Sequence, residues 1–284
     1  MSRPRVFSSP GEVEAEASAG NGRVGAWTPD SEYAHPHADV LGVKISAIDP
    51  EQAVKLAGQW IEAGSRGYIC VTGVHGVMEA QSDDELRRIL NHAVLNAPDG
   101  MPMSWVGWLQ GFKKMDRVFG PDFMLAMCRL SVERGYRTFL YGGKPGVAQL
   151  LRATLERRFP GLQVVGTYTP PFGCLTLGEE REICERVLAT RPHIVWVGLS
   201  TPKQERFMAQ FVDRFQAPLL VGVGAAFDFH TGQIRDCSAW VKRAGLQWLH
   251  RLMQDPRRLW RRYLRNNPAF LWQIARQLCG LRHP

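Results

Sequence analysis

The segments Val195–Glu205 (VWVGLSTPKQE) and Leu219–Phe229 (LLVGVGAAFDF) decide the fold that we predict for this chain. Each begins as an apolar run with the length of a buried strand, stops at small residues and continues with polar groups. In an open α/β sheet, ligands bind in the crevice outside the carboxyl ends of the strands. The two segments therefore predict a parallel sheet whose strand ends carry a ligand site.

Apolar runs and amphipathic stretches alternate along the rest of the chain. We predict strands at Val40–Ile45, Tyr68–Thr72, Thr138–Tyr141, Gln163–Thr167, Ile194–Gly198 and Pro218–Val223. We predict helices between them at Glu51–Glu62, Asp83–Leu95, Asp122–Glu133, Val147–Phe159, Glu179–Thr190 and Pro202–Phe215. This rhythm is typical of a Rossmann-like α/β fold, in which a mostly parallel sheet carries helices on both faces.

The composition of the 284-residue chain, with 45% hydrophobic residues, suits one large globular domain with an appendage. Its six cysteines form no CxxC pair, so neither a zinc ribbon nor a disulfide framework is indicated, and a reducing cytoplasm fits best. We expect residues 1–38 to be a disordered leader, because they are rich in Gly, Ser, Pro and Glu and lack an apolar core. Residues 39–238 would form the α/β domain and residues 239–284 a basic helical appendage.

The appendage concentrates the positive charge of the chain. Residues 240–284 hold ten Lys and Arg against one acid, a formal charge of +9, whereas the whole chain has +8. Aromatic residues and leucines recur there at helical spacing. Three interpretations are open: an amphipathic surface for an anionic membrane, helices packed on the domain, or a nucleic-acid-binding surface. We favour the membrane interpretation and expect no nucleic acid as a partner. No run reaches the roughly 18 apolar residues that span a bilayer, so a peripheral protein is favoured over an integral one.

Two of the expected strand ends carry groups that suit acid–base chemistry. In TGVHG, Thr72 and His75 offer a hydroxyl and an imidazole beside glycines that allow close approach. His75 is either a base or a loop histidine bonded to its neighbours. In NAPDGM, Asp99 precedes a glycine, a pair that most often marks a turn. A lone carboxylate at this edge can also act as a general base toward a hydroxyl.

The segment YGGKPG leads directly into a predicted helix. Glycines before a helix N-terminus expose backbone N–H groups and the helix dipole favours an anion, so Gly142, Gly143 and Lys144 are candidates for binding a phosphate. The segment lacks the GxxxxGK[ST] pattern of a P-loop, and the residues from Gly222 onward do not complete GxGxxG. A dinucleotide-dependent oxidoreductase is therefore disfavoured.

The loop GLSTPKQE has both a structural and a functional interpretation. If Thr201 is the N-cap of the following helix, Pro202 falls at N1 and Gln204 at N3, which makes a capping box. Lys203 is not explained in this way, because a cation in the first turn opposes the helix dipole, and an anionic ligand nearby would account for it. Asp228 lies between two phenylalanines and needs a partner, either a structural salt bridge or a substrate.

Five segments taken together, TGVHG, NAPDGM, YGGKPG, VGLSTPKQE and GVGAAFDF, resemble in sequence and order the WecG/TagA/CpsF glycosyltransferases, over about Val40–Ile274. The resemblance implies a peripheral enzyme at the cytoplasmic face of the inner membrane. Such an enzyme transfers a sugar from a UDP-sugar to a polyprenyl-diphosphate-linked saccharide and inverts the anomeric centre. The resemblance implies no essential metal and no other cofactor, in keeping with the absence of DxD and HExxH spacing, and it allows a homo-oligomer.

The resemblance also implies roles for individual residues. Asp99 would deprotonate the acceptor hydroxyl, which attacks the anomeric carbon from the face opposite UDP. Thr72 would help to hold the donor sugar, and His75 and Arg117 are further substrate-binding candidates. The nucleotide and its diphosphate would be bound by residues of four loops: Gly142, Gly143, Lys144, Gly198, Lys203, Gln204, Gly224 and Asp228. The lipid diphosphate would meet the arginines of the tail: Arg251, Arg257, Arg258, Arg261, Arg262 and Arg265.

Two departures from the family pattern bear on the donor sugar. Members that transfer N-acetylmannosamine usually have Asn two residues after the threonine, where this chain has Val74 and then His75, and they tend to have Glu where Gln247 stands. We therefore favour transfer of glucose or a related hexose, as in the exopolysaccharide branch that includes the xanthan glucosyltransferase. The alternatives are an N-acetylmannosamine transferase of the same family and a non-catalytic protein that binds membranes or nucleic acids on a nucleotide-type fold.

Overall fold

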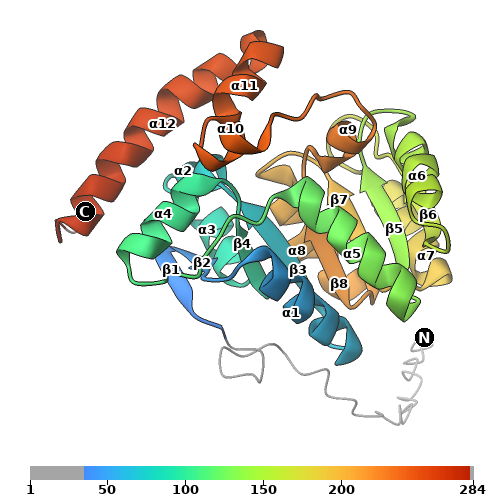
Figure 1. Ribbon diagram of the computed structural model, residues 1–284. Coiled ribbons are helices and arrows are strands. Elements are labelled where there is room, and N and C mark those ends of the chain that lie inside the picture. The colour runs from blue at the N-terminus through green and yellow to red at the C-terminus, as the bar shows by residue number, and fades with distance from the viewer. Residues whose placement is uncertain (1–34, 282–284) are drawn as a thin grey trace, which may run out of the picture.

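A sheet of six parallel strands forms the centre of the structure, a computed structural model that describes residues 35–281 (Figure 1). The strands are β3 (Gly67–Thr72), β4 (Leu95–Pro98), β5 (Arg137–Gly142), β6 (Gln163–Tyr168), β7 (Ile194–Gly198) and β8 (Leu219–Gly222). Their order is β4-β3-β8-β7-β5-β6, and every neighbouring pair is parallel. The predicted α/β fold with a parallel, Rossmann-like sheet is confirmed, and all six carboxyl ends lie at one edge.

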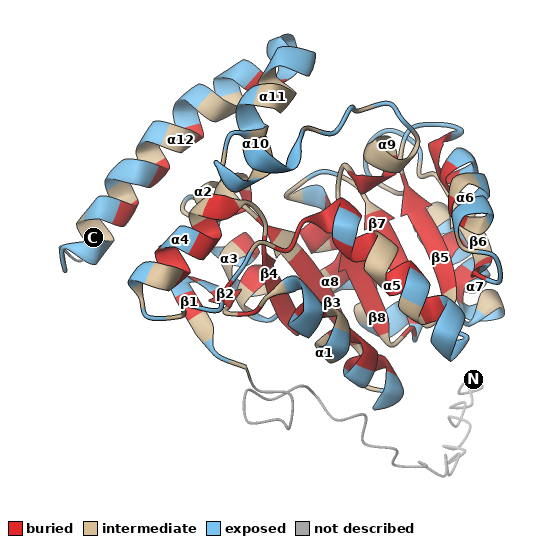
Figure 2. Cartoon of the chain, in the orientation of Figure 1, coloured by how far each residue is buried: buried red, intermediate tan, exposed pale blue. Residues whose placement is uncertain are grey.

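Helices cover both faces of this sheet, because successive side chains of a strand point to opposite sides. In β7 the buried Trp196 faces one layer, whereas Val195 and Val197 face the other. The Trp196 layer contains α1 (Pro50–Glu62), α5 (Gly120–Arg134), α6 (Val147–Arg158) and α9 (Ala226–His230). The opposite layer contains α2 (Val74–Glu79), α3 (Asp84–Asn91), α7 (Leu177–Thr190) and α8 (Lys203–Phe215). Figure 2 shows the buried strands between helices whose outer faces are exposed.

The predicted strand Val40–Ile45 is wrong, because the chain reverses direction within it. β1 (His37–Val40) and β2 (Val43–Ser46) form an antiparallel hairpin, and its turn residues Leu41 and Gly42 have φ of 55° and 79°. A tight two-residue turn of this kind needs positive φ at both positions, which leucine rarely adopts. The continuous apolar run therefore conceals the turn.

The predicted helix Asp83–Leu95 is also wrong at its carboxyl end. The helix in this region is α3 (Asp84–Asn91), and the chain then forms the short edge strand β4 (Leu95–Pro98). All four residues of β4 are buried, so the strand has no alternating pattern by which it could be recognised. Helix α4 (Met101–Leu109), which the sequence pattern did not indicate, follows. Asp99 therefore directly follows the end of β4.

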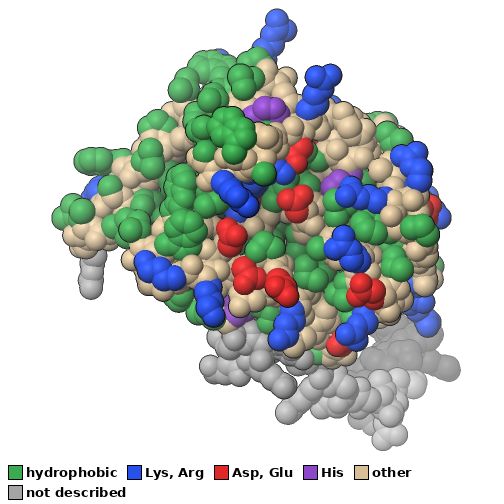
Figure 3. Space-filling view, in the orientation of Figure 1, with side chains coloured by type: hydrophobic (Ala, Val, Ile, Leu, Met, Phe, Trp, Pro, Cys, Tyr) green, Lys and Arg blue, Asp and Glu red, His purple; other side chains and the backbone are tan. Residues whose placement is uncertain are grey.

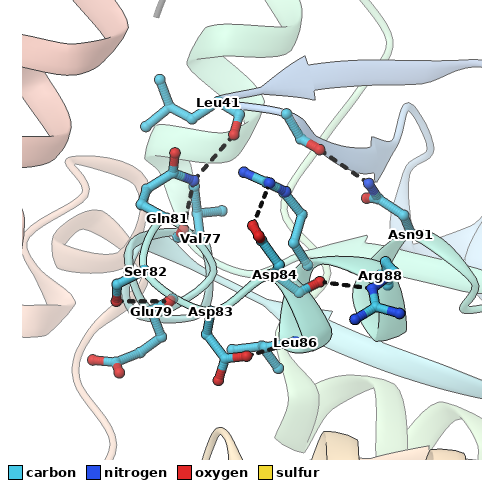
Figure 4. Close-up of polar contacts among 12 residues, drawn as sticks. Leu41, Val77, Glu79, Gln81, Ser82, Asp83, Asp84, Leu86, Arg88 and Asn91 are labelled. Atoms are coloured by element: carbon cyan, nitrogen blue, oxygen red, sulfur yellow. Dashed lines mark hydrogen bonds and ion pairs between the residues drawn. The ribbon is translucent and has the colours of Figure 1, made fainter. Parts of the chain in front are cut away.

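Side-chain amides fasten the hairpin to α2 and α3 (Figure 4). Gln81 donates from Nε2 to the carbonyl of Leu41 at 3.0 Å, and Asn91 donates from Nδ2 to the carbonyl of Gly42 at 3.0 Å. Asp83 caps α3 by accepting a hydrogen bond from a backbone N–H in the first turn of that helix. The hairpin turn is therefore held by the two helices that follow β3.

The tail packs along α2 with one face of its longest helix. It consists of α10 (Ala239–Arg243), α11 (Gln247–Gln254) and α12 (Pro256–Leu278). The buried side chains of α12 recur at helical spacing: Leu259, Asn266, Phe270 and Ile274. Gln277 also donates from Nε2 to the carbonyl of Asp39 in β1 at 2.9 Å. Packing on the domain, one of the three interpretations of the tail, thus accounts for one face of α12.

The predicted domain boundaries fall close to the ends of elements. β1 begins at His37, so residues 37 and 38 of the expected leader belong to the hairpin, while residues 1–34 lie outside the described residues. The expected appendage starts at residue 239, which is the first residue of α10. The chain is largely helical from there to residue 278.

Two neighbouring residues of α12 test whether this packing holds the tail. Phe270 is 3% exposed, whereas Leu271 is 67% exposed. We expect Phe270→Ala to lower the free energy of unfolding in urea by about 3 kcal/mol, because contacts are lost and a cavity remains. We expect the matched change Leu271→Ala to alter it by less than about 0.5 kcal/mol. Equal effects of the two substitutions would contradict the packing of α12.

Candidate active site

Asp99 lies directly after β4, beside the end of β3. Parallel pairing sets Thr72 opposite Pro98, and the backbone N–H of Asp99 donates to the carbonyl of Thr72 at 2.9 Å. A Cβ at Gly73 would come within 2.8 Å of the Asp99 carbonyl oxygen, so a glycine lets the two strand ends approach. The structure thus brings together Asp99, the predicted base, and Thr72, the predicted sugar-binding residue.

A cation flanks the Asp99 carboxylate. Arg117 Nε lies 3.9 Å from Asp99 Oδ1, and the guanidinium lies 4.3 Å from the ring centre of Phe119. Burial raises the pKa of Asp99, and the charges of Arg117 and Arg251 act against this increase. The Asp99 side chain is still 38% exposed, so contact with water moderates the effect. The carboxylate is therefore a stronger base than an ordinary aspartate and remains open to a ligand.

Several buried polar atoms in this region have no hydrogen-bond partner within residues 35–281. They include Thr72 Oγ1, Arg117 Nε and Gln247 Nε2. Buried polar groups in folded proteins are nearly always paired, and an unpaired group costs about 1–3 kcal/mol. Arg117 Nε lies beside the Asp99 carboxylate, Gln247 contacts Arg117, and Thr72 ends the strand that pairs with β4, so these atoms together indicate a site for a polar ligand.

His75 lies in α2 and faces the tail. Its Nδ1 is 3.1 Å from the side-chain amide nitrogen of Asn266 in α12 and 3.5 Å from Glu79 Oε1. Burial lowers the pKa of His75 to about 4, the charge of Arg262 adds to this effect, and the backbone of Thr201 opposes it. An imidazole with this pKa is neutral at neutral pH and a weak base. The structure favours the second interpretation of His75, a histidine bonded to its neighbours.

The tail adds cations to the same region. Of the six predicted tail arginines, Arg251 and Arg262 are half-buried, and four are exposed: Arg257, Arg258, Arg261 and Arg265. Arg251 acts on the pKa of Asp99, as described above. Burial raises the pKa of Tyr263; Arg251 and Arg262 oppose this increase and Asp99 adds to it. Arg251 and Tyr263 are therefore close enough to the Asp99 carboxylate to interact with it electrostatically, and Arg262 interacts in the same way with Tyr263 and His75.

The glycines after β5 and β7 allow close packing. Gly142 (φ 117°) and Gly198 lie opposite each other, and a Cβ on Gly142 would come within 2.5 Å of the Gly198 carbonyl oxygen. A Cβ on Gly198 would lie 2.7 Å from the ring of Phe227, and one on Gly143 (φ 77°) 3.3 Å from it. Packing alone accounts for these three glycines, and the side chain of Lys144 that follows them is exposed.

The predicted capping box after β7 is wrong, because α8 begins at Lys203 and no side chain caps it. The Thr201 hydroxyl donates instead to Glu205 Oε1 at 2.9 Å. Glu205 is a buried carboxylate, and a hydrogen bond to an ionised acceptor is stronger than one to a neutral acceptor. Gln204 Nε2 donates to the same oxygen at 3.0 Å, and Gln204 Oε1 accepts the N–H of Gly224 at 3.0 Å. Gln204 thus joins the loops after β7 and β8, using one donor and one acceptor of its amide.

Two other predicted nucleotide-binding side chains lie nearer the surface. Lys203 is exposed, and its Nζ lies 5.8 Å from the ring centre of Phe172 in the loop after β6. Asp228, in α9, is half-buried, and no cation within the described part of the chain forms a salt bridge with its carboxylate. Of the two interpretations of Asp228, contact with a substrate is the one that stays open.

Three residues of this region were not indicated by the sequence. Tyr263 and Asn266 share the inward face of α12 with Phe270, so the helical spacing of the tail offered a signal for both. Glu205 offered none, because a glutamate in the first turn of a helix is normally exposed and favoured there by the helix dipole. In this protein Glu205 is 1% exposed and burial raises its pKa.

No helix within residues 35–281 is long and apolar enough to cross a membrane. In the same residues, no three His, Cys, Asp or Glu side chains are grouped as ligands of a metal ion would be. The expectations that the enzyme needs no metal and no cofactor stay predictions.

The fold and the site are those of an α/β protein with a carboxylate of raised pKa and neighbouring cations at the carboxyl edge of a parallel sheet. A model of the glycosyl transferase WecG/TagA/CpsF family matches residues 38–284. The chain belongs to this family and is a glycosyltransferase, so the resemblance seen in its motifs is confirmed and the non-catalytic alternative is set aside.

Two Bacillus proteins are similar to this chain, and both are named N-acetylglucosaminyldiphosphoundecaprenol N-acetyl-beta-D-mannosaminyltransferase. The protein of Bacillus spizizenii is 28% identical over 205 residues, which cover 72% of this chain and 77% of the relative. The protein of Bacillus subtilis strain 168 is 24% identical over 185 residues, which cover 65% of this chain and 70% of the relative.

The lowered pKa of His75 predicts that stability depends on pH. Its folded-state pKa of about 4 lies below the ordinary value of 6.5, so the unfolded chain binds more protons between these pH values. The stability that comes from keeping His75 neutral is therefore complete above pH 6.5 and is lost as the pH falls toward 4. We expect His75→Gln to reduce the loss of unfolding free energy between about pH 7.5 and pH 4.5 by about 2 kcal/mol.

Urea unfolding at the two pH values measures this difference. The control is His92→Gln, since His92 is an exposed histidine at the end of α3. A pH dependence in His75→Gln as steep as that of the wild type would contradict the burial of a neutral imidazole.

Proposed function

We propose that this protein moves a sugar from a UDP-sugar onto a saccharide linked to polyprenyl diphosphate, with inversion at the anomeric carbon. The observation that carries the proposal is Asp99, a partly exposed carboxylate at a strand end whose Oδ1 lies 3.9 Å from Arg117 Nε and whose pKa is raised by burial, against the charges of Arg117 and Arg251. Such a base suits the deprotonation of an acceptor hydroxyl. The flanking cations suit the phosphates of the two substrates.

In the proposed reaction, the acceptor hydroxyl gives its proton to a carboxylate oxygen of Asp99 while its oxygen forms a bond to the anomeric carbon. The bond between that carbon and the UDP oxygen breaks, and its electron pair leaves with UDP. Negative charge then grows on the diphosphate, where the exposed Lys144 and the N-terminus of α6 support it. Lys203, Gln204 and Asp228 belong to the proposed nucleotide pocket.

The names of the relatives bear on the sugar that is transferred. Both are named for adding an N-acetyl-β-D-mannosaminyl group to N-acetylglucosaminyldiphosphoundecaprenol. These names support N-acetylmannosamine as the donor sugar better than the hexose that the motif departures favour, and they support an acceptor that carries N-acetylglucosamine. A β linkage is also the product that inversion gives when the sugar is α-linked to UDP.

Transfer of a hexose is kept as the second candidate because of two positions in the site. Arg117 donates to Gln247 Oε1, so the residue that departs from the family pattern is in contact with the catalytic region. Val74, the other departure, begins α2 two residues after Thr72, and His75 beside it contacts Asn266 of the tail. Both differences therefore lie next to residues of the proposed site, which supports an effect on the donor sugar.

We infer that the outward face of the tail contacts an anionic membrane surface from the cytoplasmic side. Apolar residues recur at helical spacing on this face of α12 and are 44–67% exposed: Trp260, Leu264, Leu271 and Leu278. Exposed arginines of the same helix lie among them, including Arg257 and Arg261. Figure 3 shows hydrophobic side chains gathered over the part of the surface formed by the tail. Apolar and cationic groups combined in this way support binding to anionic lipid.

Asp99→Asn tests the base, since it keeps the shape of the side chain and removes its ability to take a proton. We expect kcat to fall about 10²–10⁴-fold with little change in KM for the donor. Asp213→Asn, at an exposed position of α8, is the matched control. A folded Asp99→Asn protein with full activity would rule out Asp99 as the base.

A panel of UDP-sugars with N-acetylglucosaminyl polyprenyl diphosphate as acceptor tests the reaction and the donor. Mass spectrometry of the product is expected to show the addition of an N-acetylhexosamine from UDP-N-acetylmannosamine. Addition of a hexose from UDP-glucose instead would favour the second candidate. Transfer from none of the UDP-sugars would contradict the proposed function.

Charge on the outward face of α12 tests the membrane contact in the full chain. We expect Leu264→Glu combined with Leu271→Glu to weaken sedimentation with phosphatidylglycerol vesicles by at least about tenfold, since apolar area must leave the bilayer. Leu150→Glu, at a 49% exposed position of α6, is the control. Equal sedimentation of the tail variant and the wild type would contradict the proposed contact.

A further inference from the structure

Gln247 forms a direct side-chain contact between the tail and Arg117 of the catalytic region. It is the first residue of α11, and its side-chain Oε1 accepts a hydrogen bond from Arg117 Nη2. The same arginine is only 8% exposed, lies over the ring of Phe119 and has its Nε 3.9 Å from Asp99 Oδ1. The tail is therefore one side chain removed from the carboxylate along this route.

The distance between Arg117 and Asp99 is long for a buried guanidinium beside a carboxylate that is only partly exposed. At 3.9 Å, Arg117 Nε forms no hydrogen bond with the carboxylate and has no other acceptor within residues 35–281. A guanidinium beside a carboxylate normally closes to a pair of parallel hydrogen bonds. Gln247 binds the far end of the guanidinium, and the Phe119 ring covers its face. These two contacts hold Arg117 away from the closed pair.

The open arrangement has a chemical consequence. A carboxylate in a closed pair with arginine has a lowered pKa and hydrogen-bonded oxygens, so it takes a proton poorly. In the observed arrangement the pKa of Asp99 stays raised by burial, although Arg117 lowers it more than Arg251 does. Because the amide of Gln247 is uncharged, it orients Arg117 without neutralising it, and the cation stays available to a phosphate.

We infer that Gln247 is a positioning residue, which holds Arg117 at a distance from Asp99 and so keeps the carboxylate free to act as a base. The inference deepens the proposed function, since it rests on Asp99 being the base. It makes docking of the tail a condition for the active arrangement, because α11 is the helix that carries Gln247.

Other charged groups face Asp99 and have to be separated from this effect. Arg251 of α11 also lowers the pKa of Asp99, by less than Arg117 does. Asp99 in turn raises the pKa of Tyr263 in α12. Both residues are unchanged in variants of Gln247. A change in the titration of Asp99 in those variants therefore reports on Arg117.

Two substitutions of Gln247 shift the Asp99 titration in opposite directions if the inference holds. Gln247→Ala releases Arg117 to close on Asp99, so the midpoint should fall by about one pH unit. Gln247→Glu holds Arg117 with a carboxylate and adds a negative charge nearby, so the midpoint should rise by about one pH unit. Gln254→Ala is the control, because Gln254 lies on the same helix and bonds the backbone of Arg235 instead.

Carbon-13 NMR of the full-length protein labelled at Asp side chains measures these midpoints, with the Asp99 signal assigned from Asp99→Asn. Opposite shifts in the directions given, with no shift in Gln254→Ala, support the inference, and any other pattern overturns it. The acid limb of kcat/KM with UDP-N-acetylmannosamine should move in parallel, and kcat of Gln247→Ala should fall about tenfold. Since the NMR titration needs no turnover, failure of the wild type to transfer sugar would overturn the proposed function alone.

Discussion

The parallel pairing of β3 with β4 is the constraint on which the site depends. It sets Thr72 opposite Pro98 and lets the backbone N–H of Asp99 bind the Thr72 carbonyl. Gly73 is needed at the crossing, because a Cβ there would meet the Asp99 backbone. Since β4 has only four residues, the position of the carboxylate is set by these few backbone contacts rather than by a long strand.

The half-buried Asp99 carboxylate draws its electrostatic environment from distant parts of the chain. Arg117 precedes α5, whereas Arg251 and Tyr263 belong to the tail. Desolvation raises the pKa of Asp99 and the two cations limit that increase, so the basicity of the group is a balance of opposing effects. One of the two cations, Arg251, comes from the tail and the other from the α/β domain.

Helix α12 presents different groups on its different sides. Its inward face packs on α2 and the hairpin through Phe270 and Ile274, and contributes Asn266 to the His75 contact. Its outward face combines exposed leucines and tryptophan with arginines. One helix therefore packs on the domain on one side and offers an amphipathic surface on the other, an arrangement that suits the proposed lipid-linked acceptor.

Apolar periodicity in the sequence determined the strands β5 to β8 and the helices α5 to α8 to within a few residues, because long buried elements have clear patterns. The motifs also singled out Asp99, Thr72 and Arg117. The tertiary structure alone decided the hairpin turn at Leu41, the short strand β4, and the use of the Thr201 hydroxyl on Glu205 instead of a helix cap. It alone brought Gln247 to Arg117, since the spacing of residues along a chain records which face they share but not which distant side chain they meet.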